Sequence, residues 1–163
     1  MRPTLAALAI CLSLAPLASV AQQQVAFGGL KTDTKLPVEV TSDSLSVNQT
    51  DGTATFTGNV LIVQGEMRLK AAQVDVAYGK TDKSKIDTLH ASGGVTLVSA
   101  TEAAESKVAD YDVTAGKVVM TGDVLLTQGK NVMAGQKLTV DLASGTGQMD
   151  GRVRTVLQPE TQK

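Results

Sequence analysis

The chain has 163 residues, enough for one domain, and its formal net charge is −1. This balance of charges provides no electrostatic basis for binding nucleic acid. Two tyrosines, two phenylalanines and no tryptophan also leave little aromatic surface on which bases or sugars could stack.

The N-terminus has the pattern of a secretory signal peptide. Arg2 supplies a positive charge, residues 5–18 are almost wholly apolar, and Ser19-Val20-Ala21 offers small residues at a cleavage site. The apolar run is short for a membrane span, which needs about 20 residues, and Pro16 interrupts it. We expect residues 1–21 to be removed, with an uncleaved anchor as the alternative.

The single cysteine, Cys11, lies inside this segment. Ile10 precedes it where a lipoprotein signal requires a small residue, so lipidation is not expected. A mature chain beginning at Gln22 would contain no cysteine and hence no disulfide. Packing and strand pairing must then stabilise the fold.

Residues 22–36 are mostly polar and are expected to form a flexible lead-in. An ordered strand around Val25-Ala26-Phe27 is an equal alternative. We expect the folded domain over residues 37–158 and a short tail over residues 159–163.

A fourfold repeat dominates the rest of the chain. The triplet Gly-x-Val begins at Gly58, Gly93, Gly122 and Gly151, with spacings of 35, 29 and 29 residues. The longer first spacing is explained by six extra residues in the polar stretch 79–85, which predicts a lengthened turn. A period near 30 residues indicates a supersecondary unit stacked on copies of itself, with one shared core.

Each unit has the pattern of two strands joined by a turn. Residues 53–57 alternate polar and apolar, as do the segments around Leu45, Val74 and Val140. Turn residues separate these segments at 51–52, 115–117 and 144–147. The stretch 102–107 is the nearest to helical, but it is short. The sequence therefore predicts an all-β domain whose apolar face is covered by curling of the sheet or by a second sheet.

Catalytic chemistry has little support. His90 is the only histidine and lies in a strand-like segment, so we interpret it as a surface or packing residue. Asp75, Asp112 and Asp141 lie a whole repeat apart, without the glycine-rich run of calcium-binding repeats. We expect no enzyme, no metal site and no cofactor. The shared apolar face remains, and composition alone leaves open whether it is a packed core or a groove for an apolar ligand.

Several stretches resemble the OstA-like family. They are Val108 to Asp112 with Gly116, the run from Gly122 to Asn131, its continuation from Gly135 to Leu142, and the opening from Val38 to Leu45. The resemblance spans about residues 37–157. It implies a twisted, open β-jellyroll of about four stacked repeats with antiparallel strands, located in the periplasm.

The resemblance also implies a function. Family members bind lipopolysaccharide, with the lipid A acyl chains inside and the sugars outside. They associate head to tail and bridge inner-membrane LptC-like and outer-membrane LptD-like proteins of the same fold. The first edge is expected near residues 38–47 and the last near residues 149–157.

Positions shared between the repeats then predict the lining of the lipid channel. The expected lipid-binding residues are Val47, Phe56, Val60, Ile62, Val76, Leu97, Tyr111, Met120, Val124, Leu126 and Val140. The alternatives are a ligand-free structural β-solenoid that self-assembles, or an LptC-like partner that keeps its membrane anchor. An enzyme on a β-helix would need a strip of carboxylates or basic residues, which the repeats do not supply.

Overall fold

A computed structural model describes residues 24–26 and 30–158 of the chain. The predicted signal peptide, Phe27 and the predicted tail over residues 159–163 lie outside the described residues.

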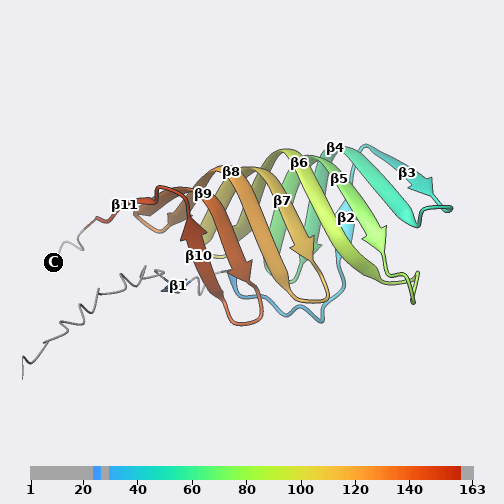
Figure 1. The fold of residues 1–163 in the computed structure, drawn as a ribbon, viewed down its shortest axis with the longest axis horizontal. Coiled ribbons are helices and arrows are strands. Elements are labelled where there is room, and N and C mark those ends of the chain that lie inside the picture. The colour runs from blue at the N-terminus through green and yellow to red at the C-terminus, as the bar shows by residue number, and fades with distance from the viewer. Residues whose placement is uncertain (1–23, 27–29, 159–163) are drawn as a thin grey trace, which may run out of the picture.

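The described residues form one antiparallel sheet of eleven strands (Figure 1). The strands are β1 (Gln24–Ala26), β2 (Glu39–Thr41), β3 (Ser44–Asn48), β4 (Thr53–Gln64), β5 (Met67–Tyr78), β6 (Ile86–Ser99), β7 (Glu102–Asp112), β8 (Lys117–Gln128), β9 (Asn131–Asp141), β10 (Thr146–Asp150) and β11 (Arg154–Val156). Their order in the sheet is β1-β10-β9-β8-β7-β6-β5-β4-β2, with β3 paired to β4 and β11 paired to β9. The prediction of an all-β fold with antiparallel strands is confirmed.

Alternating burial explains why these segments are strands. In β8, Val118 and Met120 are buried while Lys117 is exposed and Val119 is intermediate. The stretch 102–107, the nearest to helical in sequence, also lies in a strand, with Ala104 buried between less buried neighbours. Pairing of β7 on both sides therefore outweighs the helical propensity of this short segment.

The long strands bend where the Gly-x-Val triplets occur. Gly122 has φ 86° and Asp123 has φ 49°, and the pairing of β8 with β9 shifts register between Thr121 and Val124. The glycine and the following residue have positive φ in all four triplets, at Gly58-Asn59, Gly93-Gly94, Gly122-Asp123 and Gly151-Arg152. Glycine adopts this conformation without steric cost, and the extra residues increase the local bend. The triplets thus mark the corners at which the sheet folds over itself.

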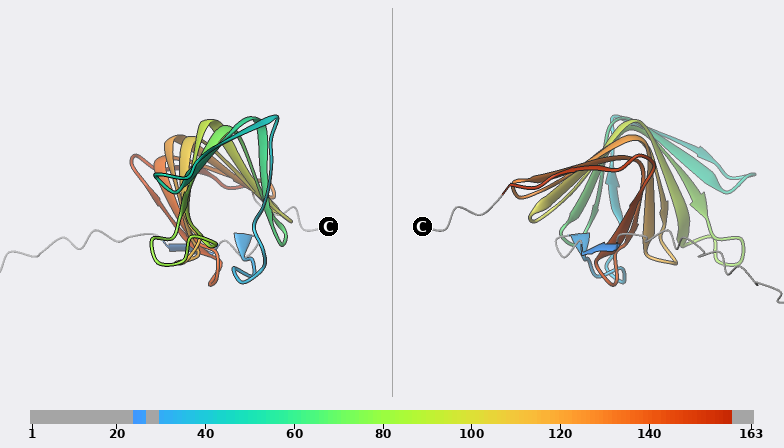
Figure 2. Two further views of the ribbon diagram at one scale, coloured as in Figure 1. Left: turned by 90° about the vertical axis from the view of Figure 1, so that its right-hand side faces the viewer. Right: turned by 60° about the vertical axis from the view of Figure 1, so that its left-hand side comes forward.

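The bent strands arch around one long axis, as Figure 2 shows in the view along the stack. The side chains inside the arch form a single hydrophobic core. This geometry is the twisted, open β-jellyroll that the resemblance implied, and that prediction is confirmed.

The turns also follow the sequence. The lengthened turn predicted over residues 79–85 joins β5 to β6. It is held by a hydrogen bond from the Gly79 amide to the Lys85 carbonyl and by an exposed contact of 3.5 Å between Lys85 Nζ and Asp82 Oδ2. The six extra residues therefore extend the turn and leave the sheet uninterrupted.

The N-terminal segment packs against the sheet over the residues described. Gln24–Ala26 pairs with β10, so of the two alternatives for this segment the structure shows the strand. Leu30 is fully buried in the core, and residues 31–38 run along the lower side of the stack to β2 (Figure 1). One edge of β10 is thereby covered, which the sequence did not indicate.

Candidate functional site

Three apolar rows line the inside of the arch, each crossing the paired strands from one end of the stack to the other. The first row is Val47, Ala54, Val76, Leu89, Tyr111, Val118, Val140 and Gly147. The second is Leu45, Phe56, Val74, Ala91, Ala109, Met120, Leu138 and Met149. The third, beyond the corner, is Val40, Ile62, Leu69, Leu97, Ala104, Leu126, Met133 and Thr155.

Most of the predicted lining residues lie inside this arch. The buried ones are Val60, Ile62, Val76, Leu97, Tyr111, Met120, Val124, Leu126 and Val140. Phe56 is partly buried and packs against the same core. The shared register of the repeats therefore brings these side chains together on one face.

Val47 is the most exposed of the predicted lining residues. It stands in the first row, opposite the buried Ala54, yet 59% of its surface is exposed. Its strand, β3, pairs only with β4 among the described strands, so no further strand covers it. The repeat placed Val47 correctly along the row but could not show that the row ends there.

The comparison of repeat positions left out more than half of the buried residues in the three rows. Leu69, Leu89, Val118 and Leu138 are buried in the rows but were not among the predicted lining residues. They are the residues that pair across the strands with predicted ones, for example Leu89 with Val76. The period-2 alternation of each strand would have found them.

Buried polar side chains among the described residues include Gln64, Ser99, Glu102 and Ser106, and Gln64 is hydrogen-bonded to the buried Tyr111. The Tyr111 hydroxyl donates a hydrogen bond of 2.5 Å to Gln64 Oε1, and both residues are almost fully buried. Gln64 Nε2 donates to the carbonyls of Thr34 and Leu36, at 3.1 and 2.9 Å. Burial raises the pKa of Tyr111 above its usual 10.0, although the hydrogen bond with Gln64 opposes this, so the hydroxyl remains protonated at neutral pH.

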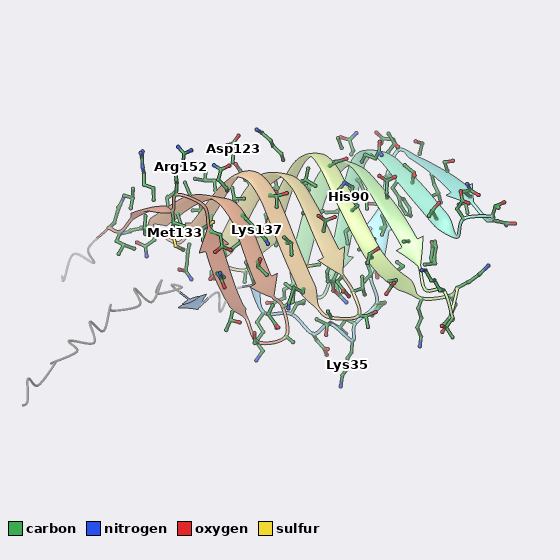
Figure 3. All side chains as sticks on the ribbon, viewed as in Figure 1. Lys35, His90, Asp123, Met133, Lys137 and Arg152 are labelled. Carbon is green, nitrogen blue, oxygen red and sulfur yellow. The ribbon has the colours of Figure 1, made fainter. Side chains whose placement is uncertain are left out.

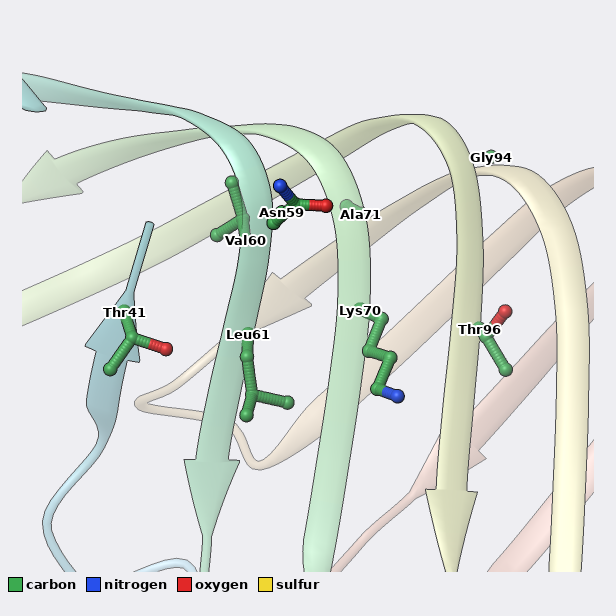
Figure 4. A pocket seen from close by; sticks show the side chains of 8 residues that line it. All are labelled: Thr41, Asn59, Val60, Leu61, Lys70, Ala71, Gly94 and Thr96. Carbon is green, nitrogen blue, oxygen red and sulfur yellow. The ribbon is translucent and has the colours of Figure 1, made fainter. Parts of the chain in front are cut away.

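A hollow of about 440 Å³ lies where β4, β5 and β6 turn their corner (Figure 4). Leu61, Lys70 and Thr96 lie side by side along it, since they are paired across the three strands. Among the described residues that line it, Lys70 is the only charged one. The hollow therefore offers one cation and little enclosure.

The described residues provide no catalytic arrangement around His90. Its side chain projects from the outer side of β6, where Nδ1 lies 2.6 Å from Asp110 Oδ1 and both groups are about half exposed (Figure 3). Within residues 24–26 and 30–158, no three His, Cys, Asp or Glu side chains cluster in a way that could hold a metal ion. No helix in this part of the chain is long and apolar enough to cross a membrane.

Comparison with known proteins identifies the family. The family model described as "LptA/(LptD N-terminal domain) LPS transport protein" matches residues 39–146. An uncharacterized protein of Rhizobium meliloti (strain 1021) is 33% identical over 145 residues, covering 83% of this chain and 78% of the relative. The lipopolysaccharide export system protein LptA of Haemophilus influenzae is 29% identical over 143 residues, covering 80% and 81%.

The fold agrees with a solved structure. LptH, described as the LptA-homologous periplasmic component of the lipopolysaccharide transport device of Pseudomonas aeruginosa, superposes with a TM-score of 0.70. The match covers 78% of this chain and 99% of LptH at 20% identity, so it supports the fold. The matched family is one of non-enzymatic transport proteins, which confirms that the chain is no enzyme. The chain belongs to the family of LptA and the N-terminal domain of LptD.

Proposed function

We propose that this chain binds lipopolysaccharide in the periplasm and shields the acyl chains of lipid A inside the arch while the sugars stay outside. Family membership supports the substrate class. The observation that carries the proposal is the set of three apolar rows, which continue from β2 and β3 at one end to β10 and β11 at the other. The interior thus provides a continuous apolar path for a lipid.

The interior needs no charged clamp to hold such a lipid. Moving acyl methylenes out of water is worth about 0.8 kcal/mol per CH₂, so several chains supply a large favourable free energy. Among the described residues, the side chains of the core inside the arch are almost all Val, Leu, Ile, Ala and Met. Methionines such as Met120 and Met133 adapt their shape to varied apolar partners.

The two ends of the stack support head-to-tail association. β3 pairs only with β4, and β11 pairs only with β9, so each end presents an unpaired strand edge among the described residues. Leu45 and Val47 are exposed at the first end, and Val153 and Val156 at the last. Copies joined in this way would form a bridge between LptC-like and LptD-like proteins of the same fold.

Site-specific photo-crosslinking tests the lipid path, and adjacent leucines form a matched pair. Leu126 is fully buried in the third row, whereas Leu125 is 38% exposed on the outer face. A photo-reactive residue at 126 should trap lipopolysaccharide in cells, and one at 125 should trap far less. Equal labelling at both positions would contradict the proposed location of the acyl chains.

A ligand-free assembly protein is a second candidate, favoured by one observation. The side chains of the interior form one packed cluster, which can stabilise the arch without a lipid. Native mass spectrometry of gently purified protein separates the two functions. A bound amphiphile of lipid A mass supports transport, and its consistent absence supports a structural role.

A further inference from the structure

The arch is closed along its lower side by the chain's own N-terminal segment. The turns β4–β5, β6–β7 and β8–β9 form one rim of the folded sheet, and the turns β5–β6, β7–β8 and β9–β10 form the other. Residues 30–36, here called the strap, run along the lower side of the stack toward β2 (Figures 1 and 2). We call the line between the two rims the seam.

Thr32 connects the strap to both rims. Its amide donates a hydrogen bond of 3.0 Å to the carbonyl of Leu142, in the β9–β10 turn. Its hydroxyl donates one of 3.0 Å to the carbonyl of Gln64, at the β4–β5 turn. The strap therefore bridges the seam as well as covering it.

Glycines in the turns allow the strap to approach closely. A Cβ atom added to Gly65 would lie 2.8 Å from Thr32 Oγ1, and one added to Gly116 would lie 2.9 Å from Thr34 Cγ2. Both distances are shorter than real contacts of a Cβ atom, so a side chain at either position would push the strap away. The two glycines belong to opposite rims, β4–β5 and β7–β8.

Leu30 anchors the start of the strap in the core, and beyond it hydrogen bonds provide most of the attachment. Leu30 is buried in the core, but Lys31, Asp33, Lys35 and Leu36 are exposed. A hydrogen bond released to water loses little net free energy, because water replaces the partner. A lipid that buries whole acyl chains has the larger driving force. The strap is therefore the part of the enclosure that is easiest to displace.

The rest of the enclosure is a wall of paired strands. From β4 to β9 every strand pairs with both neighbours nearly from rim to rim, with shifts only at the corners. A lipid with its chains inside and a large polar head group outside must cross the enclosure somewhere along its length. Only the seam permits this crossing without breaking strand pairs.

We propose that the seam is the slot occupied by the junction between the acyl chains and the sugar head group, and that the strap covers it until lipid displaces it. This inference rests on the proposed function and adds the lateral route of the ligand. On displacement, the side-chain amide of Gln64 loses its bonds to the Thr34 and Leu36 carbonyls. Gln64 and Tyr111 then face the slot and hydrogen-bond the ester, amide or hydroxyl groups at the junction.

A reversible disulfide can hold the strap in place. A Cβ at position 116 would lie 3.6 Å from Thr34 Cβ, within the Cβ separation of about 3.5–4.5 Å seen in disulfides. The test variant is Thr34→Cys with Gly116→Cys, and the single variants are the controls for oxidation. Cys11, in the predicted signal peptide, is the single cysteine of the wild-type sequence, so no other native thiol competes for the disulfide.

Binding of purified lipopolysaccharide is measured with the oxidised and the reduced double variant. Locking the strap leaves few molecules competent to bind. The apparent affinity of the oxidised form for lipopolysaccharide should therefore be at least about tenfold lower than that of the reduced form. Reduction should restore binding to the level of the Thr34→Cys single variant, which keeps Gly116. Equal binding by the oxidised and reduced forms would overturn the role of the strap while leaving the proposed function intact. Wild-type protein that binds no lipopolysaccharide would overturn the proposed function instead.

Hydrogen exchange on the wild type provides a readout that does not depend on the variant. The Thr32 amide is bonded to Leu142 and should exchange slowly in the lipid-free protein. Addition of lipopolysaccharide should accelerate exchange in residues 30–36 by about tenfold or more, since the bonds to the rims are released. Unchanged or slower exchange in this segment of the lipid-bound protein would overturn the proposal.

Discussion

At the scale of single residues, the corners of the arch make the most specific demands on the chain. Gly93 and Gly94 both have positive φ, at 81° and 88°. A Cβ on Gly93 would lie 2.6 Å from Ala72 Cβ, whereas one on Gly94 would meet nothing within 4 Å. Substitutions at these two glycines therefore distinguish the free-energy cost of a positive φ from the additional cost of a steric clash.

Gly94→Ala should reduce the free energy of unfolding by about 1–2 kcal/mol, the cost of a left-handed conformation for a residue with a Cβ. Gly93→Ala should cost at least about 1 kcal/mol more, because β5 and β6 must also move apart at Ala72. Urea unfolding of both variants measures the difference. Equal losses would show that the corner has room for a methyl group.

Tyr111 makes the stability of the protein depend on pH in the alkaline range. Its pKa is raised by burial, so the native state keeps a proton that the unfolded chain loses near pH 10. The free energy of unfolding should be insensitive to this group below pH 10 and fall as the pH rises beyond it. Tyr111→Phe should lose about 1–3 kcal/mol at pH 7, because buried Gln64 Oε1 loses its donor.

Urea midpoints at pH 8 and pH 10.5 check both effects. The wild type should lose stability between the two values, and Tyr111→Phe should lose less over the same interval. Tyr78→Phe is the matched control, since Tyr78 is only partly buried at the edge of the core. A Tyr111→Phe protein with the full alkaline loss would show that another group causes it.

At the scale of elements, local sequence signals account for most of the strands. Alternation placed parts of β3, β4, β5 and β9, turn residues marked several connections, and the positions shared between repeats put buried residues on one face. The pairing of β1 with β10 joins Val25 to Gly147, which no local signal can predict. The contacts across the seam could not be predicted either, because Thr32 bonds to Gln64 and Leu142, which lie far away in the sequence. Fewer than half of the buried row residues were predicted, because only a few equivalent positions per repeat were compared.

The equivalence of the repeats can be tested by exchanging turns. Val76 pairs with Leu89 across a connection of residues 77–88, and Tyr111 pairs with Val118 across the shorter connection of residues 112–117. Replacing residues 77–88 by the sequence Asp-Val-Thr-Ala-Gly-Lys of residues 112–117 should preserve the fold and lipopolysaccharide binding. The free energy of unfolding should fall by no more than about 3 kcal/mol. The shorter loop closes more easily, but the exchange removes the hydrogen bonds at Asp87 and within the turn, and the packing of Tyr78 and Ile86 against the core.

Circular dichroism and urea unfolding of the exchanged protein check this expectation. Loss of cooperative unfolding would mean that the longer turn has a structural role of its own. In that case the apolar hollow between Val47, Tyr78 and Lys83, about 340 Å³ in volume, would be the first place to examine.

At the scale of the whole molecule, the two ends of the stack differ in charge. Glu39 and Asp43 lie on and beside the strands of the first end, and Arg152 and Arg154 lie at the last. In the head-to-tail association proposed above, opposite charges would favour the contact of unlike ends over like ends. Such a contact also aligns the apolar rows of successive copies into one path.

Assembly should therefore depend on the edge of β11. Thr155→Pro removes a backbone donor from this strand, and Arg154→Glu reverses a charge at the same edge, so both should weaken association. Neither change touches the core, unlike a truncation from Met149, which is buried in the second row. Sedimentation velocity over a range of concentrations should show oligomers of the wild type and mainly monomers of both variants.

Adding Glu39→Arg to Arg154→Glu should restore association, because the unlike charges are then exchanged between the ends. A wild type that stays monomeric at high concentration, or a Thr155→Pro protein that still forms long oligomers, would contradict pairing through this edge.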